Sequence, residues 1–401
     1  MSMTFFWHRS ASRLPCLSGL LLGGLLACAS HHASGDAVLV ITKGGTYSGT
    51  YHSISSGQAC VRVATREPVV LAGCQLRGPG NLIEAAEGAN LTVRDCRGQG
   101  LPPTADKQPT GRFLDAYKPQ HLLVEHNLLT QTTGINVDRW TPGGGRLLVR
   151  YNQVRNIDGR WRNNSGRTSS SFLLLNTVRH LAGTEVAYNE VLNEPDHSSV
   201  EDNINLYNSS GTVASPLRVH DNFVRGAYPY PATAGQFTGT GLTTDGDART
   251  AEEATAFVLA DHNQFVATGN AGMNIAAGHD ITLRGNRLVT CGLLPGGQRF
   301  VAPYAGLGVF NFYKQPETVF FNNRAADNTI GFVHWGGTSP APDRQDLSPD
   351  HCATCTGTVH LPNPVTLATE AAEWVRWQRK LRQAHLTLGP RPLASQPANS
   401  R

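Results

Sequence analysis

A short pattern of apolar and polar positions recurs along most of the chain. It consists of about four strand-like residues, an asparagine, one variable residue and an apolar residue. Successive copies are 23 to 41 residues apart. A repeat of this length with variable spacing predicts a solenoid whose turns carry insertions. The asparagine stands at Asn127, Asn152, Asn189, Asn222, Asn263, Asn286 and Asn323, and Cys96 takes its place in an upstream copy.

A second pattern precedes most of these copies. It begins with a glycine and an apolar residue and continues in strict alternation, as in Gly134–Ile135–Asn136–Val137 and Gly272–Met273–Asn274–Ile275. Together with the segment after the asparagine, it predicts about three short strands in each repeat. No helical pattern of useful length interrupts the repeats, which excludes leucine-rich and ankyrin-type repeats.

The recurring asparagine has a physical reason. Asparagine adopts the left-handed backbone conformation that a tight turn requires. In stacked turns its side-chain amide can also hydrogen-bond to the asparagines above and below. We therefore expect a ladder of asparagines inside one corner of the solenoid.

The Asn-x-apolar repeat over residues 36–335 resembles the right-handed parallel β-helix superfamily, which includes pectate lyases and polygalacturonases. The resemblance implies an all-β fold, a right-handed single-stranded parallel β-helix, and activity on polysaccharides. Thr244–Asp245–Gly246 and Gly278–His279 are similar to two fragments of the polygalacturonase signature, in the same order. The double-aspartate element between them and the terminal Arg-Ile-Lys element are absent, so no characterised family is assigned.

The first residues are typical of an export signal. Arg9 and Arg13 precede a short apolar stretch, too short to span a bilayer, that ends in Leu25–Leu26–Ala27–Cys28. This ending resembles a bacterial lipobox, in which Cys28 would be lipidated. Cleavage at Ala27–Cys28–Ala29 with plain secretion is the alternative. We expect an extracytoplasmic protein, either membrane-anchored through a lipid or secreted.

The end of the chain has a different pattern. Trp374, Trp377, Leu381, His385 and Leu388 recur at helical spacing, which predicts an amphipathic helix whose tryptophans serve packing. We expect it to cap the end of the solenoid and protect the open sheet edges. The expected organisation is a signal peptide at 1–27, a parallel β-helix at 28–365, a C-terminal helix at 366–388 and a disordered tail at 389–401.

Cysteine spacing favours a local disulfide over a metal site. Cys352 and Cys355 have no second ligand pair nearby of the kind that zinc requires, so we expect them to bond to each other. The remaining cysteines could also pair outside the cytosol.

Composition narrows the function. The 401 residues carry 34 Lys and Arg against 30 Asp and Glu, and charged residues make up 16% of the chain. The 40% hydrophobic share is ample for a core, which excludes a disordered chain, and no long apolar run follows residue 27. Nucleic acid is excluded as a partner because its phosphates require clustered Lys and Arg.

Alternation also indicates where chemistry lies. If Ile204 and Leu206 point inward, and their counterparts in the next turns do the same, one outward polar row forms across three turns: Asn205, Tyr207, Asp245 and Asn274. Two insertions border this row. One spans 193–202 and contains Asp196, His197, Glu201 and Asp202, and the other, 226–237, contains Tyr228 and Tyr230.

These residues predict a glycan site in a groove on one face. The candidate catalytic residues are Asp245, Asp247, Asp202, Asp196 and His197, and the candidate substrate-binding residues are Asn205, Tyr207, Tyr228, Tyr230, Asn274 and His279. Paired carboxylates suit a hydrolase, whereas a lyase or epimerase requires a base and a cation. Asp202, Asp245 and Asp247 also form a candidate Ca²⁺ site. The expected partner is a polysaccharide or oligosaccharide, and the alternative function is a non-catalytic glycan- or envelope-binding lipoprotein.

Overall fold

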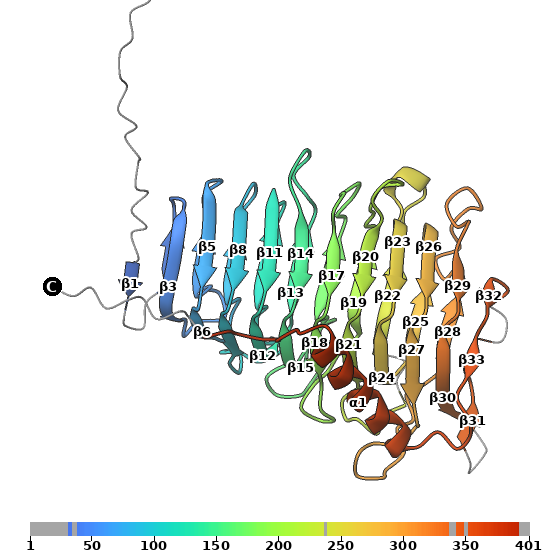
Figure 1. Cartoon of the computed structure of the whole chain (residues 1–401). Helices are drawn as coiled ribbons and strands as arrows, with labels where there is room; N and C mark the ends of the chain where they lie inside the picture. Colours follow the sequence, from blue (N-terminus) through green and yellow to red (C-terminus); the bar gives the residue numbers. More distant parts are fainter. Residues whose placement is uncertain (1–30, 34–37, 236–238, 337–341, 349–351, 393–401) are drawn as a thin grey trace, which may run out of the picture.

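The computed structural model of the chain describes residues 31–33, 38–235, 239–336, 342–348 and 352–392. These residues are mostly short β-strands in parallel ladders, with one α-helix and one short 3-10 helix, Ala251–Glu253, among them. Figure 1 shows the strands side by side in sequence order along the length of the molecule. The all-β fold and the repeat of strands expected from the sequence are therefore present.

Three ladders run the length of the molecule, and along the chain they are visited in a constant order. Ladder 1 consists of β2 (Leu39–Ile41), β4 (Val61–Val63), β7 (Ile83–Ala85), β10 (Leu114–Tyr117), β13 (Ile135–Asp138), β16 (Leu173–Asn176), β19 (Asp202–Tyr207), β22 (Thr240–Asp245), β25 (Ala271–Ile275) and β28 (Ala305–Val309).

Ladder 2 consists of β1 (His31–Ala33), β3 (Gly45–His52), β5 (Pro68–Ala72), β8 (Asn90–Arg94), β11 (His121–Glu125), β14 (Leu147–Arg150), β17 (Glu185–Ala187), β20 (Leu217–His220), β23 (Ala256–Asp261), β26 (His279–Arg284), β29 (Arg324–Ala326) and β32 (Cys355–Thr356).

Ladder 3 shares β3 with ladder 2 and continues with β6 (Gln75–Gly78), β9 (Arg97–Gly100), β12 (Leu128–Thr132), β15 (Gln153–Ile157), β18 (Glu190–Leu192), β21 (Phe223–Ala227), β24 (Gln264–Thr268), β27 (Arg287–Thr290), β30 (Thr329–Trp335) and β33 (Val359–His360). β31 (Pro342–Arg344) pairs antiparallel to β30.

The core lies between the ladders. The predicted inward positions are buried on every strand of ladder 1 where they were assigned: Ile135, Val137, Ile204, Leu206, Leu242, Thr244, Met273 and Ile275. Their register across strands is direct, so that Ile204 pairs with Leu242 and Leu242 with Met273. The inward side chains therefore stack in columns that are apolar except at Thr244, and this stacking removes their apolar surface from water.

The predicted asparagine ladder is present at the corner between ladders 2 and 3. Each side-chain amide donates to the Oδ1 atom of the next asparagine at 2.9 to 3.0 Å, from Asn127 through Asn152, Asn189, Asn222, Asn263 and Asn286 to Asn328. Cys96 precedes them, and its backbone amide donates to Asn127 Oδ1 at 2.9 Å.

Two details of the asparagine prediction are wrong. The last member is Asn328, because Asn323 instead binds the Gly278 carbonyl and the Ile281 amide. The left-handed backbone conformation also belongs to the residue before the asparagine, as at Tyr151 (φ 58°) and Tyr188 (φ 52°). The asparagine itself is retained for its amide, which satisfies buried backbone groups that no strand partner reaches.

Helix α1 (Leu367–Gln383) is present, as the sequence predicted, but it packs along the outer side of ladder 3 and does not cap the open end of the sheets (Figure 1). Thr366 caps its N-terminus through a capping box. Trp377 is fully buried against Phe223, and its indole nitrogen donates to Glu190 at 3.0 Å. Glu373 receives two hydrogen bonds of 2.7 Å from Arg287. The helix thus covers the apolar outer side of four turns.

The segment after α1 is not a disordered tail throughout. It runs back toward the N-terminal strands (Figure 1), and the Gly389 amide donates to the Tyr151 carbonyl at 2.9 Å. The Arg391 guanidinium binds both carboxylate oxygens of buried Asp95, at 2.9 and 3.0 Å. The prediction of a tail beginning at residue 389 is therefore corrected through residue 392, and residues 393–401 lie outside the described part.

Replacing Arg391 by alanine is expected to destabilise the protein by about 1 to 2 kcal/mol, because Asp95 keeps its charge but loses its partner. Burial pushes the pKa of Asp95 up, but the hydrogen bonds and charge of Arg391 outweigh it and hold the pKa below its usual value. The stabilisation is thus fully present at neutral pH, weakens below about pH 4 and is lost as the pH falls through the lowered pKa of the folded protein. Thermal unfolding at pH 7 and pH 2 measures it, with exposed Arg379→Ala as control. An equal loss at both pH values would contradict the ion pair.

The cysteines are assigned in part. Cys352 and Cys355 form a disulfide, as predicted. Cys60, Cys74, Cys96 and Cys291 are buried free thiols, so the expectation that they could pair is wrong for them. Cys16, Cys28 and the predicted signal peptide lie outside the described residues. Within the described ranges, no helix has the length and hydrophobicity needed to span a membrane.

Candidate active site

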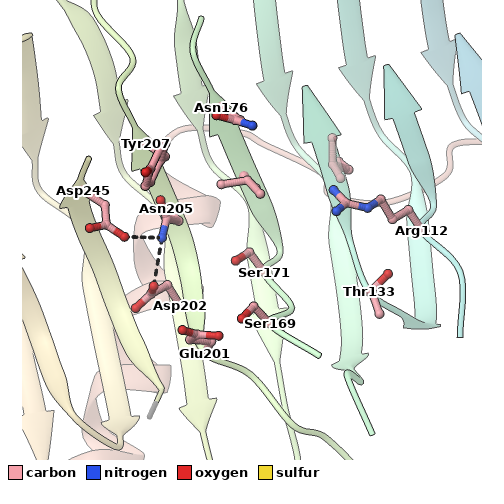
Figure 2. A pocket seen from close by; sticks show the side chains of 12 residues that line it. Arg112, Thr133, Ser169, Ser171, Asn176, Glu201, Asp202, Asn205, Tyr207 and Asp245 are labelled. Atoms are coloured by element: carbon pink, nitrogen blue, oxygen red, sulfur yellow. Dashed lines mark hydrogen bonds between the residues drawn. The ribbon is translucent and has the colours of Figure 1, made fainter. Parts of the chain in front are cut away.

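A cavity of about 290 Å³ opens on the outer face of ladder 1 (Figure 2). Its floor is formed by side chains of the outward row on β16, β19 and β22, and its rim by residues that precede β10 and β16. The lining includes two acidic side chains from one insertion and one from the end of β22: Glu201, Asp202 and Asp245. Acidic groups from two points of the sequence therefore meet in one hollow.

Asn205 joins two of these carboxylates. Its Nδ2 atom donates to Asp202 Oδ2 at 2.9 Å and to Asp245 Oδ2 at 3.2 Å (Figure 2). The two N–H bonds of an amide diverge by roughly 120°, so the two carboxyl oxygens are about 5 Å apart. The register explains the arrangement, because Tyr207 of β19 pairs with Asp245 of β22.

Asp202 is held where it retains a proton more readily than usual. It is 9% exposed, and Thr240 donates a hydrogen bond to its other oxygen, Oδ1. Burial raises the pKa of Asp202 to about 6, aided by the charges of Asp245 and Glu201 and opposed by the hydrogen bonds from Thr240 and Asn205. A carboxyl group in this state can donate a proton near neutral pH.

Asp245 has a different environment. It is partly exposed, and the Gly246 amide donates to its Oδ1 at 3.1 Å. Gly246 has φ 140°, and a Cβ atom there would lie 2.1 Å from Asn208 Oδ1, so this turn requires glycine. Tyr313 donates to Asp245 from the loop after β28. Burial, followed by this hydrogen bond and the nearby acidic charges, raises the pKa of Tyr313, which keeps the phenol a donor.

Tyr207 and Asp247 stand beside the pair. Burial and the hydrogen bond to Asp247 raise the pKa of Tyr207 to about 12. Hydrogen bonds from Asn208 and Tyr207 lower the pKa of Asp247, whose Oδ1 lies 3.0 Å from Asn208 Nδ2. Tyr207 lines the cavity, whereas Asp247 does not.

Arg112 lies on the opposite side of the cavity (Figure 2). Burial lowers its pKa, and the charges of Asp115 and Asp138 oppose that effect. Its guanidinium makes no hydrogen bond with the described residues, so its donors face the cavity. Neither Arg112 nor Tyr313 was predicted from the sequence. Arg112 precedes β10, and nothing in the repeat pattern distinguishes it from the other arginines.

Several predicted residues lie elsewhere. Asp196 and His197 line a second cavity between the 193–202 insertion and α1, so the expected convergence of all the acids on one groove is wrong for these two. Asp196 instead accepts the Ala232 amide at 2.8 Å. Asp196 has a left-handed backbone conformation (φ 59°), so the insertion turns sharply there. This turn separates Asp196 and His197 from Asp202.

The predicted aromatic and histidine contacts are also absent from this cavity. Tyr228 is 2% exposed and packs on Phe300 in the apolar cluster beneath α1. Tyr230 lies under the Arg160 guanidinium, whose Cζ atom is 4.9 Å from the centroid of the Tyr230 ring. His279 is buried, with its ring nitrogens bound to Asp280 and to the Ala251 carbonyl. Asn205 and Asn274 are on the predicted row, and residues 236–238 lie outside the described part.

The candidate calcium site does not form. Asp202 accepts hydrogen bonds from Thr240 and Asn205. Asp247 accepts hydrogen bonds from Asn208 and Tyr207. Across the described residues, no group of three or more His, Cys, Asp or Glu side chains is arranged to hold a metal ion. The donors of the three aspartates therefore do not converge as calcium coordination requires.

Comparison of the chain with protein-family models, curated proteins and solved structures yields no match. The function is therefore inferred from the geometry of this cavity.

Proposed function

We propose that the protein is a glycoside hydrolase that cleaves a glycan in the cavity on ladder 1. The observation that carries the proposal is the pairing of Asp202 and Asp245 on one amide nitrogen, about 5 Å apart, with unlike environments. Asp202, with its pKa raised to about 6, would protonate the glycosidic oxygen. Asp245, beside the Gly246 amide and the Tyr313 phenol, would attack the anomeric carbon.

The separation of the carboxyl groups favours one stereochemical course. A gap of about 5 Å leaves no space for a water between carboxylate and sugar, as inversion requires, and suits a direct attack with retention. Water then releases the sugar from Asp245, and Asp202 acts as the base for that step. Arg112, across the cavity, would bind sugar hydroxyls or an acidic substituent.

The test is an assay of the purified protein against neutral and acidic polysaccharides. We expect new reducing ends without the ultraviolet absorbance of unsaturated sugars, and retention of configuration in the first product seen by NMR. Unsaturated products would replace the proposal by a lyase. Binding without turnover of any substrate would leave the non-catalytic alternative, a glycan- or envelope-binding protein.

The finer architecture and the location are part of the same proposal. A constant order of three ladders, each strand parallel to its counterpart in the next turn, supports a single-stranded parallel β-helix. The right-handed sense follows from the strong preference of parallel crossover connections. Residues 1–28 support export and lipidation at Cys28, which would place a glycan-cleaving enzyme at its substrate outside the cytoplasm.

A further inference from the structure

A second hollow lies on the same face of ladder 1, next to the acid pair. It has a volume of about 480 Å³ and lies over β25 and β28, the two strands that follow β22 in the ladder. Its walls carry Tyr304, Phe310 and Phe312, together with Asn270, Asn274 and Ser348. No charged side chain lines it among the described residues.

The floor of this hollow is shaped by small residues. Ala271 and Ala305 pair across β25 and β28, and Gly308 occupies the row position next to Asn274. The row position beside Asn274 on β28 therefore carries no side chain of its own. Phe312 is 63% exposed and Tyr304 is 39% exposed, so two aromatic rings stand at the edge of a shallow, uncharged surface. Sugar rings present apolar C–H faces that pack on such rings.

Asn274 adds a polar group that lacks a partner. The side chain is 7% exposed, and its Oδ1 atom is buried without a hydrogen bond in the described structure. A buried carbonyl oxygen without a hydrogen bond has lost its water and gained no partner, which destabilises the unliganded protein. It therefore calls for a donor, which a ligand hydroxyl in this hollow would supply.

The orientation of the Asn274 amide follows from the acid pair. Asp202 accepts from Thr240, so the Thr240 oxygen is left to accept from the Thr243 hydroxyl at 3.1 Å. Thr243 in turn accepts from Asn274 Nδ2 at 3.2 Å. Each hydroxyl has a single hydrogen, so this series of hydrogen bonds requires the Asn274 Nδ2 atom to donate to Thr243. The Asn274 Oδ1 atom is then the acceptor that has no partner.

The same row carries a second such acceptor. Asn205 uses both amide hydrogens on Asp202 and Asp245, and its Oδ1 is also buried without a partner. Asn205 pairs with Thr243, and Thr243 with Asn274, so the two acceptors are two strand spacings apart, about 9 to 10 Å. A single monosaccharide does not span this distance, whereas an oligosaccharide along the row does.

We propose that the hollow over β25 and β28 is a binding subsite for a neutral sugar ring, which stacks on Phe312 and Tyr304 and donates a hydroxyl to Asn274 Oδ1. This inference deepens the proposed function and rests on it for the identity of the bound chain. The substrate is then a glycan with an uncharged residue two positions from the residue held at Asn205.

Calorimetric titration tests the subsite without turnover. The Asp245→Asn protein is titrated with neutral hexasaccharides of glucose, xylose, mannose and galactose, and with hexagalacturonate for comparison. At least one neutral hexasaccharide should bind. Adding Phe312→Ala should weaken its affinity about tenfold, the fold-change of one aromatic contact, while exposed Ile54→Ala should leave it unchanged. Phe312 is exposed, so the variant is expected to fold.

Three outcomes overturn the subsite. They are the absence of binding by every neutral hexasaccharide, an affinity unchanged in both Phe312→Ala and Tyr304→Ala, and a loss seen only with hexagalacturonate. Measurements of hydrolysis distinguish a failure of the subsite from a failure of the proposed hydrolase function. In the otherwise wild-type enzyme, Phe312→Ala should raise KM for a cleaved hexasaccharide and not for a short aryl glycoside. If binding depends on Phe312 but nothing is hydrolysed, the subsite stands and the hydrolase proposal fails.

Discussion

The Asp202→Asn enzyme is expected to hydrolyse a natural glycan about a thousandfold more slowly than the wild type, with little change in KM. A general acid contributes about 10² to 10⁴ in rate, and asparagine keeps the hydrogen bonds in reach but supplies no proton. In the wild type, kcat/KM should fall as the pH rises through about 6, because Asp202 with its raised pKa loses its proton there. The variant should lack this decline. Initial rates between pH 4.5 and 8 measure both effects.

Substrates with different leaving groups distinguish the role of Asp202 as acid from that of Asp245 as nucleophile. An aryl glycoside with an acidic phenol departs without protonation, so Asp202→Asn should retain much of its activity on it, whereas Asp245→Asn should not. Glu252→Gln, an exposed acid, is the matched control and should behave as wild type. Similar losses for both aspartate variants on both substrates would remove the division of roles. Full activity of Asp245→Asn would end the assignment of the site.

Replacing Asn222 by alanine is expected to lower the free energy of unfolding by about 3 to 5 kcal/mol, although Asn222 is remote from the cavity. Its side chain donates to Asn263 and to the Val186 carbonyl, and accepts from the amide of Asn189. All these groups are buried, so several would be left without partners at about 1 to 3 kcal/mol each. Urea unfolding followed by circular dichroism measures the change.

Asn322→Ala is the matched control for the asparagine ladder. Asn322 is exposed and hydrogen-bonds to Asp280 outside the series, so its loss, including the strain of alanine at φ 50°, should cost no more than about 2 kcal/mol. Asn222→Asp provides a second comparison, because it keeps the acceptor oxygens but loses the amide donors. Equal stability of the Asn222 and Asn322 variants would show that the stacked amides contribute no more than a surface turn.

The outward row was predictable because alternation is a local property. Once Ile204 is inward, Asn205 must be outward, and the constant register then places it beside Thr243 and Asn274. The prediction failed for Asp196 and His197 because an insertion has no periodicity to constrain it. Its turn directs them toward α1, which begins 171 residues after Asp196.

Arg112 and Tyr313 are site residues that the sequence pattern did not predict. Each enters the site from a connection that precedes or follows a strand of ladder 1, and neither belongs to the repeat. The raised pKa of Asp202 likewise depends on burial by groups distant in sequence, including Thr240. Packing between residues that are distant in sequence produces these features. The local pattern of apolar and polar positions therefore cannot predict them.

The sequence by itself determined the strand repeat, the inward residues, the asparagine series up to its last member, and the packing role of the C-terminal helix, because each depends on spacing along the chain. Only the tertiary structure decided which acids meet at Asn205, which residue before each asparagine takes the left-handed turn, and that the segment around Arg391 returns to Asp95. These depend on how insertions and ends pack against distant turns, where burial and hydrogen bonding select one arrangement among many that the local pattern allows.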